Sequence, residues 1–176
     1  LSDDAFTRGR LMAMNVIRLI CYLAIGHAVF AFGEYLVDLA AATHHVDSAL
    51  CAFANDGLSF TRNLEYWELD ASNCGTLSTG SEFYIFSQGQ VISDAAGMTI
   101  ELELAWVDLV EVVVWLFILF LIELRIRLQD LGISSSRLLS FATTTKGVLY
   151  GILWCLAVYW AHRGHWIFAW DEALWI

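Results

Sequence analysis

Three long apolar runs separated by polar segments dominate the chain. They cover about residues 11–42, 102–124 and 147–161. A helix needs about 20 predominantly apolar residues to cross the hydrocarbon core of a bilayer, and the centre of the second run, residues 112–122, has no polar atom outside one indole. The pattern predicts an all-α membrane protein with three transmembrane helices, forming a single membrane domain over residues 1–176.

The segment between the first two runs, residues 43–99, is polar and rich in Ser, Asn, Asp, Gly and Thr. Turn signals begin at Asn55 and at Asn73, each followed within two residues by glycine. Residues 82–86 and 90–92 are apolar or aromatic enough to favour two short strands. We therefore expect a structured loop between helices 1 and 2, with a small hairpin in it.

Composition narrows the class of protein further. Hydrophobic residues make up 59% of the chain, against roughly 45–50% in soluble domains. The formal net charge is −10, with 19 acidic and 9 basic residues. Binding to nucleic acid requires clustered Lys and Arg, so the charge balance argues against a nucleic acid partner and leaves the lipid bilayer and other membrane proteins.

The basic residues predict the orientation in the membrane. Seven of them flank the start of the first helix or lie between the second and third: Arg8, Arg10, Arg18, Arg125, Arg127, Arg137 and Lys146. Only Arg62 and Arg163 fall on the other side. Cytoplasmic loops carry the excess of Lys and Arg, so we expect a cytoplasmic N-terminus, with residues 43–99 and the C-terminus outside. Helices rather than strands then indicate a bacterial inner membrane or its equivalent.

The cysteines fall into two pairs. Cys51 and Cys74 both lie in the loop that we place outside the cytoplasm, where an oxidising compartment favours a disulfide. Such a bridge is worth roughly 3 kcal/mol for a loop of this length. Cys21 and Cys155 lie within apolar runs and are interpreted as small packing residues.

Ionisable residues within the apolar helices are the candidate functional residues, because a charge inside the bilayer is costly. The first helix carries His27, Glu34 and Asp38 on one face, the second carries Glu101, Asp108 and Glu111 on one face, and His162, Arg163 and His165 end the third. From the helix rise of about 1.5 Å per residue, we expect all of them except His27 to lie in the outer half of the membrane.

Three interpretations of this polar cluster stay open. The groups lie in the wet interface and pair to lock the helices, with Glu34–Arg163 and Asp108–His162 as natural partners. Alternatively, they contact a neighbouring subunit, or they line a path for protons or metal ions. Carboxylate and imidazole suit iron, manganese or zinc, but these helices contain no Glu-x-x-His spacing, so we predict no metal site.

His27 lies near the membrane midplane, between Gly26 and Ala28. One interpretation is a buried, hydrogen-bonded core histidine. The other is an axial ligand of a haem or chlorin, because small neighbours let a flat macrocycle approach the helix.

No P-loop, dinucleotide fingerprint, nucleophile elbow or zinc-protease motif occurs in the chain, so we predict no catalytic residues. The leading hypothesis is a non-catalytic integral subunit with a structural or assembly role in a larger membrane complex of respiratory or photosynthetic type, whose partners are other integral membrane subunits. The alternatives are a subunit of an oligomeric proton or divalent-metal transporter that uses the acidic face, and a pigment- or haem-binding subunit through His27.

Overall fold

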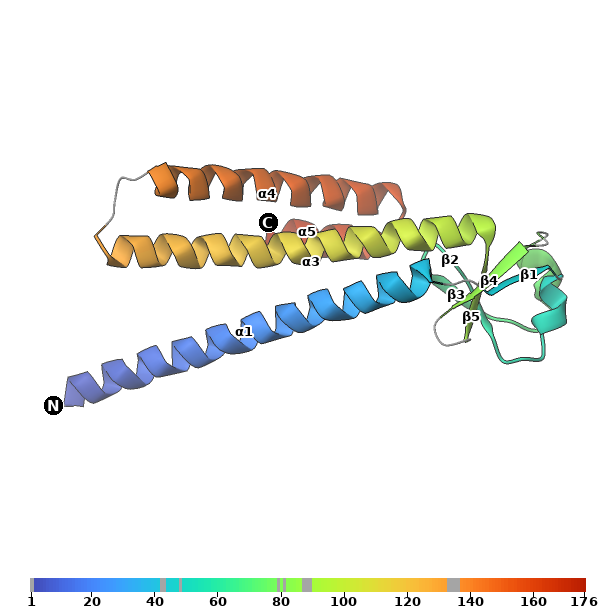
Figure 1. The fold of residues 1–176 in the computed structure, drawn as a ribbon, viewed down its shortest axis with the longest axis horizontal. Helices are drawn as coiled ribbons and strands as arrows, with labels where there is room; N and C mark the ends of the chain where they lie inside the picture. The colour runs from blue at the N-terminus through green and yellow to red at the C-terminus, as the bar shows by residue number, and fades with distance from the viewer. Residues whose placement is uncertain are drawn as a thin grey trace. The chain divides into compact units, whose positions relative to one another are not determined.

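The computed structural model describes residues 2–41, 44–47, 49–78, 80, 82–86, 90–132 and 137–176. Its elements are shown in Figure 1 and occur in the order α1 (Ser2–Ala40), β1 (His44–Asp47), η1 (Leu50–Phe53), β2 (Ser59–Arg62), β3 (Glu65–Glu68), α2 (Cys74–Leu77), β4 (Glu82–Phe86), β5 (Val91–Asp94), α3 (Ala95–Asp130), α4 (Arg137–His162) and α5 (Trp166–Trp175). They form two compact units, a helical unit of Leu1–Ala31 with Val110–Ile176, and a sheet unit of Phe32–Leu109.

Three helices of the described chain are long and apolar enough to span a membrane, namely the part of α1 from Met12 to Ala40, α3 and α4. The three predicted apolar helices are therefore confirmed, but their ends differ from the prediction. α3 begins at Ala95 and α4 at Arg137, both earlier than the apolar runs, and α1 ends at Ala40. Polar helical turns extend the apolar segments, as where Arg127 pairs with Glu123 over 2.9 Å.

The helical unit is held together by apolar packing between α3 and α4. Val114 and Ile118 of α3 and Leu153 of α4 are buried together, and Ile176 packs on them. α4 runs alongside α3, and α5 turns back beside them (Figure 1). A helix pair that shares one apolar seam leaves its other faces exposed, which suits a lipid environment.

Within the helical unit, the N-terminal part of α1 contacts α3 through polar atoms. Arg18 lies 3.4 Å from the Glu123 carboxylate, and the Tyr22 hydroxyl donates to the Leu119 carbonyl over 3.5 Å. These contacts place the basic residue Arg18 beside the acidic end of the second apolar run.

The sheet unit contains a five-stranded sheet in the order β1-β4-β5-β2-β3. β4 and β5 pair antiparallel, as predicted for the hairpin, with Tyr84 opposite Ser93. β2 pairs parallel with β5 and antiparallel with β3. An all-α fold therefore does not describe the whole chain. The sequence hides the extra strands because they are only four residues long, and the edge strand β3 is mostly exposed.

The sheet covers its own small core. Leu58, Phe60, Phe83 and Ile92 from the strands are buried with Leu50, Leu69 and Cys74. A second buried cluster lies between the sheet and the long helices. In it, Leu36 and Leu39 of α1 and Ala105 of α3 pack with Phe86 of β4. The C-terminal part of α1 and the first turns of α3 therefore share one small core with β4.

Candidate functional site

One face of α1 carries exposed apolar side chains along its length. Leu23, Phe30 and Val37 are 65%, 61% and 67% exposed, and they share one side because seven residues complete almost two helical turns. His27 and Glu34 lie on the same side, also seven residues apart, and both are exposed. We call this surface the outer face of α1.

Glycines make the outer face of α1 accessible to another helix. A Cβ atom placed on Gly26 or Gly33 meets no atom within 4 Å beyond its chain neighbours and the backbone of its own helix. The His27 side chain is exposed within the described chain, which argues against the first interpretation as a buried core histidine. The haem or chlorin ligand stays a prediction, and an absorption spectrum of the purified protein tests it. Asp38, the third predicted residue of this helix, is also exposed.

Glu101 belongs to the sheet unit. Its side chain is only 1% exposed, and its Oε1 accepts a hydrogen bond from the backbone N–H of Leu64 over 3.0 Å. The Tyr35 hydroxyl lies near the Glu101 and Asp108 carboxyl groups. Glu101 thus supports the turn between β2 and β3 by accepting a hydrogen bond from its backbone.

Glu111 lies in the helical unit, in contact with the two elements that follow it. The Trp160 Nε1–H of α4 donates to Glu111 Oε2 over 3.1 Å. The carboxyl group of Glu172, from α5, faces the Glu111 carboxyl and the Trp115 indole. Two carboxyl groups and two indoles therefore meet where α3, α4 and α5 pack together. We call Glu111 and Glu172 the carboxyl pair.

The residues predicted at the end of α4 have different surroundings. His162 is exposed. Arg163 donates to the Tyr159 hydroxyl over 3.1 Å, and its guanidinium lies 5.4 Å from the centre of the Tyr159 ring. His165 packs edge-on against Trp160 at 5.7 Å and precedes α5. This segment forms the turn that directs α5 back along α4.

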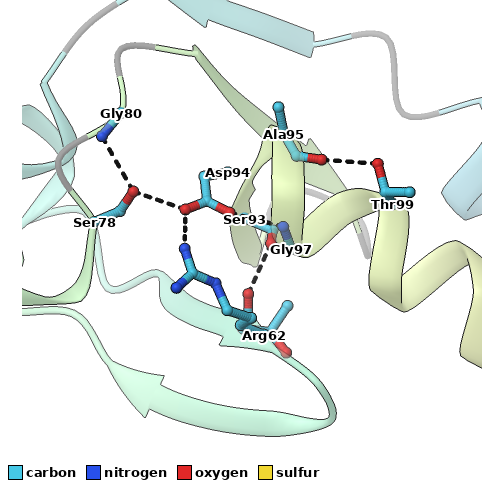
Figure 2. Close-up of polar contacts among 9 residues, drawn as sticks. Arg62, Ser78, Gly80, Ser93, Asp94, Ala95, Gly97 and Thr99 are labelled. Atoms are coloured by element: carbon cyan, nitrogen blue, oxygen red, sulfur yellow. Dashed lines mark hydrogen bonds and ion pairs between the residues drawn. The ribbon is translucent and has the colours of Figure 1, made fainter.

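A second polar network lies in the sheet unit, around Asp94 at the start of α3 (Figure 2). Asp94 Oδ1 accepts from the Gly97 N–H over 2.7 Å, which caps the helix. Its Oδ2 accepts from the Ser78 hydroxyl over 2.7 Å and pairs with the Arg62 guanidinium. Ser93 donates to the Thr61 carbonyl over 2.7 Å. The network joins β2, the segment before β4, and α3.

An open pocket of about 470 Å³ lies beside this network, lined by Arg62, Thr76, Leu77, Ser78, Gly80, Glu82, Asp94, Ala95 and Ala96. The charges of Arg62 and Asp94 are paired with each other. The arrangement therefore acts as a structural anchor of the long helix α3 on the sheet.

The predicted disulfide between Cys51 and Cys74 is present, with Cα atoms 5.0 Å apart. It joins η1 to α2, and Cys74 is part of the buried core of the sheet unit. Cys21 and Cys155 are free and exposed within the described chain, and their interpretation as small packing residues of membrane helices stays a prediction. Their place on apolar helices fits contact with lipid.

The predicted polar cluster is divided between the two units. Glu34, Asp38, Glu101 and Asp108 belong to the sheet unit, and Glu111, His162, Arg163 and His165 belong to the helical unit. The pairings Glu34–Arg163 and Asp108–His162 stay predictions. Within the described residues, no group of three His, Cys, Asp or Glu side chains is arranged to hold a metal ion.

Sequence reasoning missed Glu172, the buried member of the carboxyl pair. One signal was available. In a helix, Ala169, Glu172 and Ile176 fall on one face. Because Ala169 and Ile176 are apolar, Glu172 is an acidic residue within the apolar stripe of a short amphipathic helix. An acid at such a position is a candidate for a buried, partnered carboxyl group.

Comparisons with models of protein families, with curated proteins and with solved structures find no match. The geometry of the outer face of α1 and of the carboxyl pair is therefore the basis for assigning a function.

Proposed function

We propose that the chain is a non-catalytic integral membrane subunit that joins a larger membrane complex through the outer face of α1. The observation that carries the proposal is the exposure of His27 and Glu34 on an apolar helix whose most apolar stretch has no buried residue. An ionisable side chain that faces lipid is costly and normally finds a partner inside a bundle. A neighbouring helix with polar side chains at these levels satisfies both groups.

The exposed face of α4 provides the contrast. Its exposed large side chains include Phe141, Val148, Trp154 and Val158, and the sequence between Lys146 and His162 contains no Asp, Glu, Lys, Arg or His. This face suits lipid without any polar partner. Gly26 and Gly33 on α1 add a second argument, because small residues let the backbones of membrane helices approach closely.

The partner that fits the outer face is an apolar helix of another integral subunit, with a basic or hydrogen-bond-donating side chain at the level of Glu34. In the proposed arrangement, the N-terminus is cytoplasmic, α1 at the level of Glu34 lies within the membrane, and the five-stranded sheet lies outside, in a bacterial inner membrane or its equivalent. The Cys51–Cys74 disulfide supports that side for the sheet unit, because such bridges persist in oxidising compartments. Respiratory and photosynthetic assemblies are the complexes that this description fits.

Site-specific photo-crosslinking in native membranes tests the proposal. A photoreactive phenylalanine analogue at Phe30 is expected to give one protein adduct of defined mass, whereas the same analogue at Trp154 on α4 gives none. Glu34→Ala and Gly26→Leu should each abolish the Phe30 adduct. Gly151→Leu is the matched control, because Gly151 on α4 is equally open. A lone monomer in mild detergent without any Phe30 adduct would refute the proposal, and an adduct with a second copy would assign a homo-oligomer instead.

The carboxyl pair favours a second candidate, a subunit of an oligomeric proton transporter. Ionisable residues inside membrane bundles commonly mark proton paths. In reconstituted vesicles, Glu111→Gln and Asp108→Asn should then abolish a proton flux that the unaltered protein supports. Absence of flux in the unaltered protein would exclude this candidate.

A further inference from the structure

α5 is a short helix that returns along the two helices before it. It has ten residues, so it is about 15 Å long and too short to span a membrane. The chain turns at Gly164, whose φ is +87°, and the His165 N–H donates to the Trp160 carbonyl over 3.0 Å. Ala169 and Glu172 are the buried residues of α5. An acid therefore lies on the face that packs against α3 and α4.

The Glu172 side chain is buried without a full set of partners. The residue is 3% exposed, and its Oε1 has no hydrogen-bond partner within the described chain. Its neighbours are the Glu111 carboxyl and the Trp115 indole, while Trp160 donates to Glu111. The ion pairs Arg18–Glu123, Arg62–Asp94 and Arg127–Glu123 do not involve the carboxyl pair.

The titratable groups that face Glu172 are mostly acidic. Glu111 faces it from α3, and Asp171 adds a further negative charge from α5 itself. From α4, the neutral Trp160 indole donates to Glu111, and His165 packs against that indole. Two facing carboxylates in a buried site repel each other, and a single shared proton removes that repulsion while making a hydrogen bond between them.

We propose that Glu111 and Glu172 form a proton-binding site, and that the one proton they share fixes α5 against α3 and α4. The proton comes from bulk water and returns to it, so no other reactant is needed. The two indoles stabilise the single negative charge that remains on the pair. The inference does not depend on the docking of α1 to a partner.

The site makes the attachment of α5 sensitive to pH. Burial, followed by the Glu111 carboxyl, raises the pKa of Glu172 from 4.5 to about 7. Because the attached state binds the proton more tightly than the detached state, the stabilisation is complete below the ordinary pKa. It is lost as the pH rises through about 7. α5 is therefore expected to be attached in mildly acidic solution and to loosen in mildly alkaline solution.

Thiol labelling of the full chain in lipid nanodiscs tests the attachment. In a Cys21→Ser and Cys155→Ser background, a cysteine is placed at Ala173, which lines a groove with α4, or at Leu174, which is exposed. The ratio of the two labelling rates cancels the pH dependence of the thiol itself. This ratio should rise about tenfold over the two pH units centred on the transition, as the protonated fraction falls from about 90% to about 10%.

Substitutions separate the carboxyl pair from other causes of pH dependence. Glu172→Gln and Glu111→Gln remove the repulsion, so the ratio should stay low at every pH. Asp130→Asn, an exposed acid at the end of α3, should keep the pH profile of the unaltered protein. A flat ratio in the unaltered protein, or a Glu172→Gln variant that retains the profile, would overturn the proposal.

Infrared spectroscopy observes the proton directly in the unaltered protein. The unaltered protein should show the carbonyl band of a protonated carboxyl group that disappears as the pH rises through neutrality. The band should be absent from Glu172→Gln at neutral pH. Absence of a carboxyl band titrating near neutrality in the unaltered protein would contradict the shared proton.

Discussion

The Leu64 backbone N–H donates to Glu101 Oε1 over 3.0 Å, and this bond joins the tip of the β2–β3 hairpin to α3. The turn has no glycine. Asn63 and Leu64 have φ values of 58° and 60°, the left-handed region that a two-residue hairpin turn requires. A leucine adopts it only at a steric cost of about 1–2 kcal/mol, so the bond to a buried carboxyl group offsets part of that cost.

Removing the Glu101 carboxyl group should release the hairpin tip. A buried backbone N–H that loses its acceptor costs about 1–3 kcal/mol, so the Leu64 amide in Glu101→Ala should exchange with solvent deuterons roughly 5–100-fold faster. Glu101→Gln keeps an acceptor oxygen and should lie between Glu101→Ala and the unaltered protein. Amide exchange of the full chain in detergent measures this. Unchanged exchange in Glu101→Ala would show that the bond does not hold the turn.

The effect of a substitution at Leu64 on stability should depend on how well the new residue tolerates positive φ, and not on the size of its side chain. Leu64→Val is expected to lower the thermal midpoint, because a β-branched residue is least tolerant of positive φ. Leu64→Gly should be the more stable of the two variants, because glycine reaches φ near +60° without the steric penalty. The midpoints can be followed by tryptophan fluorescence in one detergent. Equal midpoints for the two variants would argue against a strained turn.

How far the sequence predicts this fold depends on the range of the interactions. The apolar helices follow from composition over one segment, and the β4–β5 pairing follows from two neighbouring apolar stretches. β3 was not predictable, because an exposed edge strand such as Glu65–Glu68 shows no apolar alternation, and its turn lacks the usual Asn-Gly signal. The parallel pairing of β2 with β5 joins strands far apart in sequence.

The candidate sites show the same limit. Glu34 is exposed and faces away from the rest of the described chain. The sequence pattern of a single helix does not reveal which of its faces the other helices cover. Glu101 has the spacing of the other acids of its helix, yet it is held by a hairpin that the sequence did not reveal. Glu172 reaches Glu111 only because the chain reverses at Gly164.

The Cys51–Cys74 bridge should account for a large part of the stability of the sheet unit. By the chain-entropy argument it contributes about 3 kcal/mol, so reduction should lower the thermal midpoint of this unit. Alkylation of the denatured chain followed by mass analysis checks the pairing. Of the four cysteines, only Cys21 and Cys155 should label without reductant. Labelling of all four would contradict the bridge and the proposed outer location of the sheet unit.

Gly97 is required where α3 passes closest to β2. A Cβ atom at this position would lie 2.3 Å from Ser93 Oγ and 3.3 Å from the Thr61 carbonyl oxygen. Gly97→Ala must therefore displace the Ser93 hydroxyl from its bond to Thr61 or shift the helix, and overpacking of this kind typically costs about 1–3 kcal/mol. The thermal midpoint of the full chain, measured by circular dichroism in detergent, should fall accordingly.

Two further variants decide whether the close contact at Gly97 is the cause. Gly75→Ala is the matched control, because a Cβ atom there meets nothing within 4 Å, and its midpoint should stay unchanged. Ser93→Ala removes the nearest atom, so Ser93→Ala with Gly97→Ala should be less destabilised than the sum of the single variants, as expected for residues in contact. Strict additivity, or a loss in Gly75→Ala as large as in Gly97→Ala, would show that the contact between α3 and β2 is not what requires a glycine.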